Sequence, residues 1–131
     1  MVTYRPSAVG VTADQLEGFF EGWPKPPTTH THLEILRGSD HVVLAVDPVR
    51  VVGFITAISD GVLSAYIPLL EVLPDYRQQG IGSELVRQML EKLRGFHTVD
   101  LVCDPELQGF YARFGMKPYT AMIIRNLDST G

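Results

Sequence analysis

The chain has 131 residues, of which 45% are hydrophobic and 20% are charged, and this composition predicts one folded domain spanning residues 1–131 rather than a disordered chain. The net charge of −4 argues against a nucleic-acid-binding surface. No apolar run approaches the roughly 20 residues of a membrane helix, the first residues lack a signal-peptide pattern, and Cys103 is the single cysteine, so we expect a cytoplasmic protein without a membrane partner.

The first forty residues predict one strand and two short helices. The strand lies within residues 2–11. Residues 12–15 match a capping box, in which two side chains three positions apart satisfy each other's backbone N–H groups, and a helix should follow. The proline-rich segment 22–27 ends that helix. A second capping box at residues 31–34 predicts another short helix, which ends near Gly38.

The middle of the chain predicts an antiparallel meander followed by a long helix. Three strand-like segments, 41–46, 51–58 and 63–73, are separated by turn residues such as Asp-Pro and Ser-Asp-Gly. After Gly80, apolar residues recur with a period of about 3.6 residues, which is typical of an amphipathic helix. Gly95 supplies a stop signal for that helix.

A strand at 98–103, a helix at 105–114 and a last strand at 118–125 complete the predicted elements. Their order is β-α-α-β-β-β-α-β-α-β. The fold class is therefore α+β, with a mixed, mainly antiparallel sheet, flanking helices and one central βαβ crossover around the long helix.

Two glycines, Gly80 and Gly82, lie where the long helix begins, although glycine costs roughly 1 kcal/mol relative to alanine inside a helix. Glycines at a helix N-terminus let a phosphate approach the free backbone N–H groups. Arg77 and the amides of Gln78 and Gln79 add a positive charge and further donors. A tight turn that needs a positive φ explains one glycine better than two, so we predict a phosphate-binding loop.

The phosphate loop resembles that of a known family. It is not a P-loop, because no Gly-Lys-Ser/Thr follows, and Leu85 replaces the third glycine of a dinucleotide fingerprint. Arg77-Gln78-Gln79-Gly80-Ile81-Gly82 resembles the central motif of the GNAT N-acetyltransferase superfamily, and residues 72–76 match its lead-in. Residues 110–116, Phe-Tyr-Ala-Arg-Phe-Gly-Met, resemble a second motif of that family. The order of the predicted elements is also similar to the GNAT fold.

The resemblance implies that acetyl-CoA binds in a V-shaped opening between the strands 63–73 and 98–103, and that no metal takes part. An amine would attack the thioester carbonyl directly. Backbone groups near Val72 would bind the pantetheine and polarise the acetyl carbonyl, and the pyrophosphate would lie on the amides of residues 77–83. The implied CoA contacts are Leu70, Val72, Leu73, Arg77, Gln78, Gln79, Gly80, Ile81, Gly82 and Ser83.

Pro68 is an independent observation on that opening. Proline removes a ladder donor, so inside a predicted central strand it indicates either a position where two strands diverge or a β-bulge. Both interpretations stay open at the level of sequence.

The resemblance makes Tyr111 the general acid that protonates the departing thiolate. Core packing is the alternative for Tyr111, because Phe110 and Phe114 share its short helix. Glu71 is the candidate general base, acting through a water molecule. Strand alternation turns the Glu71 side chain away from that of Val72, so a structural role is equally compatible with the sequence.

Other residues whose side chains could bind a ligand or react have simpler interpretations. Trp23, in the stiff proline-rich loop, would either form a wall of the acceptor cleft or cap the core. The sequence shows no third metal-ligating residue to accompany His30 and His32, so we expect solvated loop histidines rather than a metal site. Cys103 is expected to be a small buried residue, and Asp104 a helix N-cap.

We therefore expect an acetyl-CoA-dependent N-acetyltransferase. The alternatives are a CoA-binding sensor or scaffold without turnover, and an acyltransferase with a longer acyl donor or a hydroxyl acceptor. A chain of this size offers little room for docking a macromolecule, which favours a small-molecule amine over a protein. A homodimer is compatible with the sequence.

Overall fold

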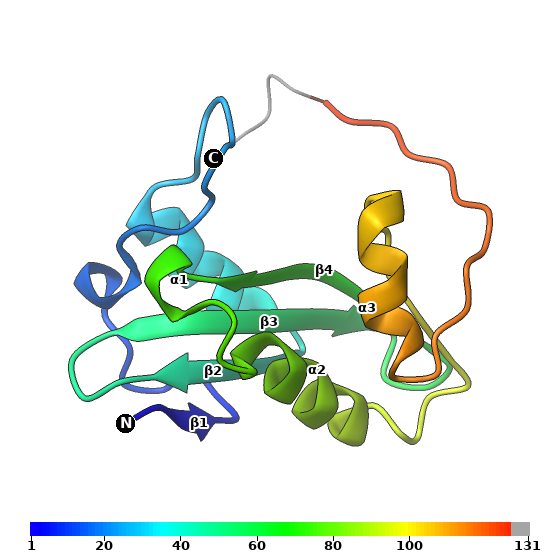
Figure 1. Cartoon of the computed structure of the whole chain (residues 1–131), viewed down its shortest axis with the longest axis horizontal. Coiled ribbons are helices and arrows are strands. Elements are labelled where there is room, and N and C mark those ends of the chain that lie inside the picture. Colours follow the sequence, from blue (N-terminus) through cyan, green and yellow to red (C-terminus); the bar gives the residue numbers. More distant parts are fainter. Residues whose placement is uncertain (127–131) are drawn as a thin grey trace.

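The computed structural model describes residues 1–126. Its centre is a five-stranded sheet with the strand order β1-β2-β3-β4-β5 (Figure 1). Strands β1 to β4 pair with one another in antiparallel order, and β5 pairs with β4 in parallel. This pairing confirms the predicted meander and mixed sheet. The strands are β1 (Thr3–Arg5), β2 (His41–Val46), β3 (Val51–Ser59), β4 (Ser64–Val72) and β5 (Thr98–Asp100).

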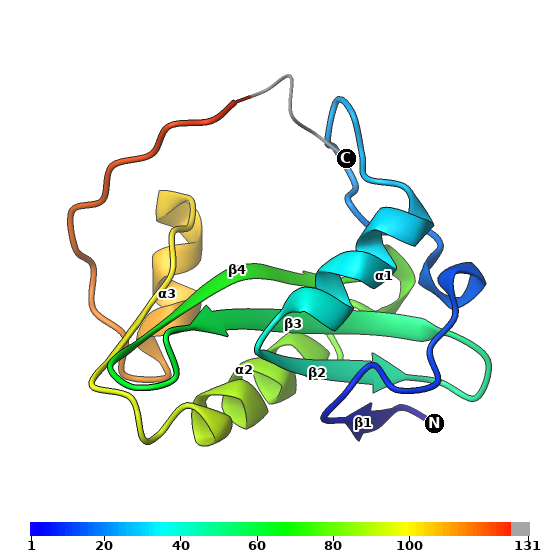
Figure 2. The same ribbon diagram turned by 180° about the vertical axis from the view of Figure 1, so that it is seen from behind.

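Helices cover both faces of the sheet. Helix α1 lies on one face, and α2 and α3 lie on the other, as the two opposite views show (Figures 1 and 2). Among the described residues, none of the helices is both long and apolar enough to cross a membrane. The helices are α1 (Thr29–Gly38), α2 (Ile81–Lys92) and α3 (Gln108–Ala112), with 3-10 turns η1 (Ala13–Leu16), η2 (Pro74–Tyr76) and η3 (Pro105–Leu107).

The core forms where the apolar face of α2 meets the central strand. All of β3 from Val51 to Ala57 is buried, because both faces of this strand are covered. Helix α2 contributes Leu85 and Met89, whose side chains are fully buried against the sheet. Burying each such side chain stabilises the fold by roughly 1.5–3 kcal/mol. This packing holds the N-terminus of α2 at the end of β4.

The start of α1 differs from the prediction. The helix begins at Thr29, and Thr28 is the cap, since its hydroxyl accepts the Thr31 N–H at 3.1 Å. The predicted capping box at residues 31–34 is therefore wrong. Thr28 follows the proline-rich segment, so it is the first residue that can cap a helix there. The predicted capping box at residues 12–15 is present, with the Gln15 side chain accepting the Thr12 N–H at 3.0 Å. The helix expected after it is only the single 3-10 turn η1.

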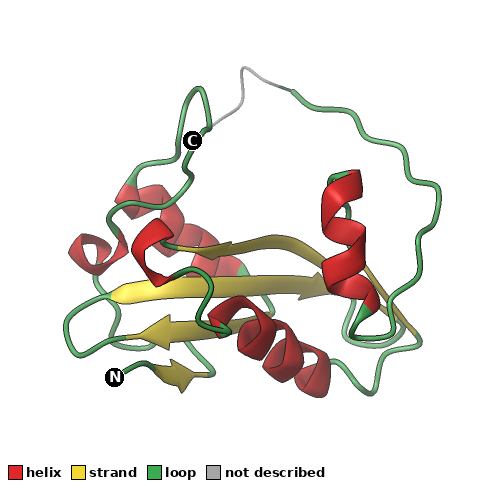
Figure 3. Cartoon of the chain, viewed as in Figure 1, coloured by secondary structure: helices red, strands yellow, loops and turns green. Residues whose placement is uncertain are grey.

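The C-terminal part shows the largest differences. Strand β5 ends at Asp100 rather than at residue 103, and the helix expected at 105–114 consists of η3 and α3. Residues 117–126, here called the C-terminal arm, form no strand (Figure 3). Their side chains are exposed throughout. The strand predicted at 118–125 is therefore wrong for the described chain, because nothing pairs with it there. Helix α2 ends with Leu93 as its cap, without a left-handed Gly95.

Candidate active site

The site begins where β4 and β5 separate. Their parallel pairing ends at Tyr66 and Asp100, whereas β4 continues to Val72. Pro68 lies beyond the last paired residue on this side. On the other side the β3–β4 register shifts between Thr56 and Ile58, so that one residue of β3 faces two of β4, which is a β-bulge. Both interpretations of Pro68 are thus correct, and the V-shaped opening expected between these strands is present.

The end of β4 presents backbone groups to this opening. The Leu73 N–H donates to the Val52 carbonyl at 2.9 Å, so it points toward β3 and is not free for a ligand. Backbone groups alternate in direction along a strand, which turns the N–H and C=O groups of Leu70 and Val72 away from β3. The Val72 carbonyl accepts the Arg77 Nε–H at 2.9 Å on that side. The Val72 N–H therefore faces the opening.

The two glycines of the predicted phosphate loop are there for different structural reasons. Gly80 is the N-cap of α2 and has φ +80°, a left-handed conformation that favours glycine. Gln78 also has a positive φ, +62°, which tightens the turn. Gly82 needs no such conformation, and a β-carbon added to it would lie 3.9 Å from Phe110 and from Val72. The turn therefore requires Gly80, whereas Gly82 keeps the first turn of the helix open to a ligand.

A cavity of about 510 Å³, here called the donor cavity, lies beside this loop. It brings together most of the residues that the sequence assigned to CoA. Leu73, whose side chain is buried, and Gln79, whose amide donates to the Asp75 carbonyl at 3.4 Å, do not line it. The lining residues are Leu70, Glu71, Val72, Tyr76, Arg77, Gln78, Gly80, Ile81, Gly82, Ser83, Leu107, Phe110 and Tyr111.

A second arginine, which contacts the first turn of α2, was not identified from the sequence. The Arg77 guanidinium is held by the Val72 carbonyl and, at 3.1 Å, by the Glu21 carboxylate. Arg113 instead donates to the Ser83 hydroxyl at 3.1 Å, in the first turn of α2. Its guanidinium lies 5.0 Å from the centre of the Phe110 ring. Arg113 stands two positions after Tyr111 in the second motif, but only the packing of α3 beside α2 brings it to the loop.

A second cavity of about 570 Å³, here called the acceptor cavity, opens on the other side of β4. Leu70, Glu71, Leu107 and Tyr111 line both cavities. Tyr111 is half-buried, and this burial, with a smaller contribution from Cys103, raises the pKa of its hydroxyl above the ordinary value. The hydroxyl thus stays protonated at neutral pH, as a general acid must.

The comparison with known proteins agrees with this geometry. The profile of the Acetyltransferase (GNAT) family matches residues 9–116. This chain belongs to the GNAT acetyltransferase family. A crystal structure named as that of an acetyltransferase from Deinococcus radiodurans R1 is 47% identical, covers 97% of this chain and 90% of its own, and superposes with a TM-score of 0.94. A GNAT family protein from Streptococcus pneumoniae is 29% identical, covers 96% and 98% of the two chains, and has a TM-score of 0.78.

Curated GNAT relatives are more distant. The uncharacterized N-acetyltransferase ycf52 of Porphyra purpurea is 28% identical over 72% of this chain. GCN5-related N-acetyltransferase 1, chloroplastic, of Arabidopsis thaliana is 28% identical over 85% of this chain. The chain spans 57% and 59% of the lengths of these two relatives. The fold and the family are those of the GNAT acetyltransferases.

In this GNAT domain Glu71 is tied to the loop that follows η1. Its carboxylate accepts the Phe20 N–H at 2.8 and 3.0 Å and the Glu21 N–H at 3.3 Å. Phe20 has φ +65°, a left-handed conformation that is strained for a bulky residue. These bonds favour a positioning role for Glu71, which holds the loop in this conformation. A role as general base stays a prediction.

The same loop carries an aromatic wall. Trp23 is 46% exposed, lines the acceptor cavity and meets the Phe20 ring edge-on at 5.1 Å. This exposure favours a wall of the acceptor cavity over a cap on the core. Cys103 and Asp104 line the same cavity. Cys103 is half-buried rather than buried as expected, and the Asp104 side chain makes no capping hydrogen bond although Asp104 is the residue before η3.

The two histidines near α1 have opposite environments. His30 is exposed, whereas His32 is 1% exposed and its ring lies 4.4 to 5.3 Å from those of Phe19, Phe20 and Phe54. The interpretation of His32 as a solvated loop residue is therefore wrong. Its two ring nitrogens have no hydrogen-bond partner, and burial lowers its pKa to about 4. Within residues 1–126, no three metal-ligating side chains form a group.

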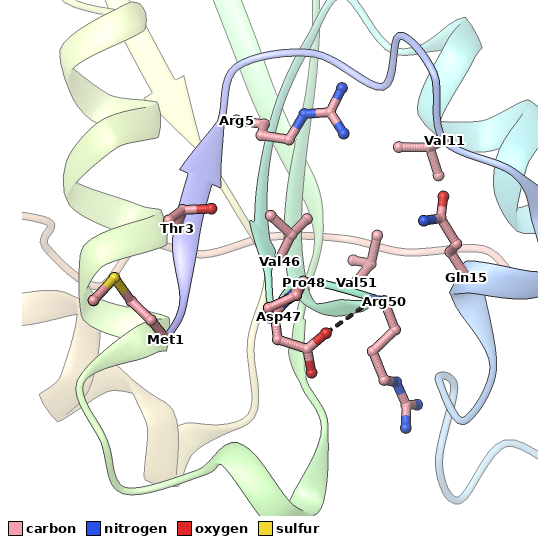
Figure 4. Close-up of a pocket in the computed structure, with 10 residues that line it drawn as sticks. All are labelled: Met1, Thr3, Arg5, Val11, Gln15, Val46, Asp47, Pro48, Arg50 and Val51. Atoms are coloured by element: carbon pink, nitrogen blue, oxygen red, sulfur yellow. Dashed lines mark hydrogen bonds between the residues drawn. The ribbon is translucent and has the colours of Figure 1, made fainter.

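A third hollow, of about 400 Å³, lies between β1 and the β2–β3 turn (Figure 4). The charged side chains that line this hollow form hydrogen bonds with backbone groups and hold those segments in place. The Arg5 guanidinium donates to the Val9 carbonyl, and that of Arg50 donates to the Glu17 carbonyl at 2.8 Å. Asp47 accepts the Arg50 N–H at 2.9 Å. These partners indicate a structural role, so the donor and acceptor cavities are the better candidate for catalysis.

Proposed function

We propose that this chain transfers an acetyl group from acetyl-CoA to the primary amine of a small molecule by direct transfer. The observation that carries the proposal is that Tyr111, a protonated phenol, lines both the donor cavity and the acceptor cavity. A group at that junction can reach the bond that breaks as well as the atoms on either side of it.

The donor side has the features that CoA requires. The first turn of α2 offers free backbone N–H groups and the positive end of the helix dipole to the pyrophosphate. Arg113, beside Ser83, adds a cation within reach of a phosphate. The Val72 N–H, which faces the opening, would donate to the acetyl carbonyl and stabilise the oxyanion that develops on it.

The reaction itself needs one acid and one proton acceptor. The amine nitrogen attacks the carbonyl carbon, forming the C–N bond, and the C–S bond breaks. Tyr111 gives its proton to the departing thiolate, and the nitrogen loses a proton to water or, through water, to Glu71. A deprotonated Tyr111 then regains a proton from solvent.

The acceptor cavity favours a small amine with an apolar body. Phe20 and Trp23 present aromatic surface, which attracts both apolar groups and cations. Glu71, which like Tyr111 lines both cavities, adds a carboxylate. A cavity of about 570 Å³ is in the range of small-molecule sites. The cytoplasm, where acetyl-CoA and reduced Cys103 are both expected, is the proposed location.

The test is free-thiol release from acetyl-CoA against a panel of small amines, amino acids and peptides. The chain should release thiol fastest with an amine that carries an apolar or aromatic body. Calorimetry with acetyl-CoA, done on the same protein, separates binding from turnover. Tight binding without thiol release for any acceptor would favour the sensor or scaffold alternative, and no binding of acetyl-CoA would overturn the donor assignment.

A further inference from the structure

The loop between η1 and α1 has a backbone conformation that other parts of the chain must stabilise. Gly18, Phe20 and Gly22 all have positive φ, at +95°, +65° and +84°. Glycine adopts this conformation freely, whereas a phenylalanine keeps it only where surrounding contacts hold it. We call residues 17–23 the acceptor loop, because Phe20 and Trp23 line the acceptor cavity. The position of this cavity wall therefore depends on the contacts that anchor the loop.

Two charged side chains from the donor side anchor the middle of the acceptor loop. The Glu71 carboxylate accepts the N–H groups of Phe20 and Glu21. The Arg77 guanidinium forms an ion pair with the Glu21 carboxylate at 3.1 Å. Glu71 and Arg77 both line the donor cavity. Figures 1 and 2 show the acceptor loop and the segment after β4 at the same end of the sheet. Residues of the donor side thus hold a wall of the acceptor cavity.

The Arg77 guanidinium connects this loop to the end of β4. Its Nε–H donates to the Val72 carbonyl at 2.9 Å, while one of its Nη atoms donates to Glu21. A guanidinium carries five N–H donors in a planar fork, so one side chain can hold two acceptors in fixed directions. Val72 is also the residue whose N–H faces the opening between the strands. Arg77 therefore joins the acceptor loop to the strand end that receives the donor.

The same contacts argue against a phosphate contact as the main role of Arg77. Arg113 donates to the Ser83 hydroxyl in the first turn of α2, beside the free N–H groups of the helix N-terminus. Arg77 precedes this turn, and its guanidinium is held by Val72 and Glu21. The Glu21 carboxylate also offsets the positive charge that would attract a phosphate. The structure thus provides one arginine beside the first turn of the helix and another for the acceptor loop.

We propose that Arg77, through its ion pair with Glu21, is a positioning residue for the acceptor amine. The pair holds the acceptor loop against the end of β4, so that Phe20 and Trp23 stay in place as a wall of the acceptor cavity. The inference rests on the proposed acetyl transfer for its acceptor, but the anchoring of the loop does not depend on turnover.

The expected size follows from the exposure of the pair. The Arg77 and Glu21 side chains are 45% and 55% exposed, and an ion pair in such a position contributes little to the stability of a whole domain. Its loss should instead favour local opening of the acceptor loop, which has a strained residue at its centre. We expect an effect of about fivefold on the loop, about 1 kcal/mol, and little change in melting temperature.

The first measurement is hydrogen exchange of the Phe20 amide by NMR, without substrates. Glu21→Ala and Arg77→Met each remove the ion pair, and each should make this amide exchange about fivefold faster. The control is Arg94→Met with Glu91→Ala, which removes another exposed Arg–Glu pair, at 2.9 Å near the end of α2, and should leave the Phe20 amide unchanged. Unchanged exchange in both loop variants, or the same acceleration in the control, would overturn the proposal.

The second measurement is kinetic and uses the amine that gives the fastest thiol release. Glu21→Ala and Arg77→Met should each raise the acceptor KM about fivefold, with the acetyl-CoA dissociation constant changed less than twofold by calorimetry. Adding Glu21→Ala to Arg77→Met should have no further effect, because both changes remove the same interaction. Independent, multiplying effects on KM would show that Glu21 does not act through Arg77, and the proposal would fail.

Arg77→Lys separates positioning from phosphate binding. Lysine keeps the positive charge that a phosphate needs, but its single ammonium cannot hold Val72 and Glu21 in the directions of the guanidinium fork. A positioning role predicts a rise in acceptor KM of at least threefold with acetyl-CoA affinity intact. If Arg77→Met instead weakens acetyl-CoA binding tenfold and leaves both the acceptor KM and the Phe20 exchange unchanged, Arg77 is a phosphate ligand. A wild type without turnover would refute the acetyl transfer alone, since the exchange measurement still decides whether the pair anchors the loop.

Discussion

Buried His32 should make the stability of this protein fall in mild acid. Its ring is enclosed by Phe19, Phe20 and Phe54, and neither ring nitrogen has a hydrogen-bond partner. Protonation would place an uncompensated charge among aromatic rings, so burial lowers the pKa from 6.5 to about 4. The unfolded chain has no such barrier and binds the proton near the ordinary pKa.

The sign and size follow from linkage. Below pH 6.5 the unfolded state binds more protons than the folded state, so the free energy of unfolding decreases as the pH falls, until the folded state also binds its proton near pH 4. With these two pKa values the loss is about 2 kcal/mol between about pH 7.5 and pH 5 and about 3 kcal/mol near pH 4. Above pH 7.5 His32 contributes no slope.

The assay is urea unfolding at pH 7.5 and pH 5, followed by circular dichroism. His32→Leu, of similar volume, should lose about 2 kcal/mol less stability than the wild type over this interval. His30→Leu is the matched control at an exposed position and should keep the wild-type loss. If the wild type and His32→Leu lose the same stability, His32 is not the titrating group and the reasoning is refuted.

Four further predictions concern the site. Gly82→Val should weaken acetyl-CoA binding at least tenfold, about 1.4 kcal/mol, by crowding the first turn of α2, and unchanged affinity by calorimetry in a folded variant would remove the phosphate site from this loop. Tyr111→Phe should lower kcat about 100-fold with CoA affinity nearly intact, whereas full activity would reassign Tyr111 to packing. Glu71→Gln keeps an oxygen that can accept the Phe20 N–H, so if Glu71 is a positioning residue this variant should change kcat less than about threefold, whereas Glu71→Ala should raise the acceptor KM about tenfold. An equal and large fall in kcat for both variants would instead identify Glu71 as a base. Trp23→Ala should raise the acceptor KM with little change in melting temperature, and a loss of about 3–5 kcal/mol of stability with an unaltered KM would make Trp23 a core residue.

The sequence by itself determined the elements whose signal is local. The strands β2 and β3 and helix α2 were predicted within a residue or two, because turn residues and apolar period act over a few neighbouring positions. The tight turn that begins α2 was also predictable, since Gly80 and Gly82 conflict with the helix that they begin, and its binding of a phosphate stays a prediction. The two motifs sufficed to indicate the family.

Tertiary structure decided what depends on contacts between distant segments. Glu71 meets the Phe20 amide, 51 positions away in the chain, and Arg113 meets Ser83 from another helix. His32 is buried only because a loop and a strand close over α1. The arm was predicted as a strand from its composition, but a strand exists only where a partner supplies the other half of its hydrogen bonds. Local sequence encodes the tendency to be extended, whereas pairing requires the partner's position, which only the assembled fold supplies.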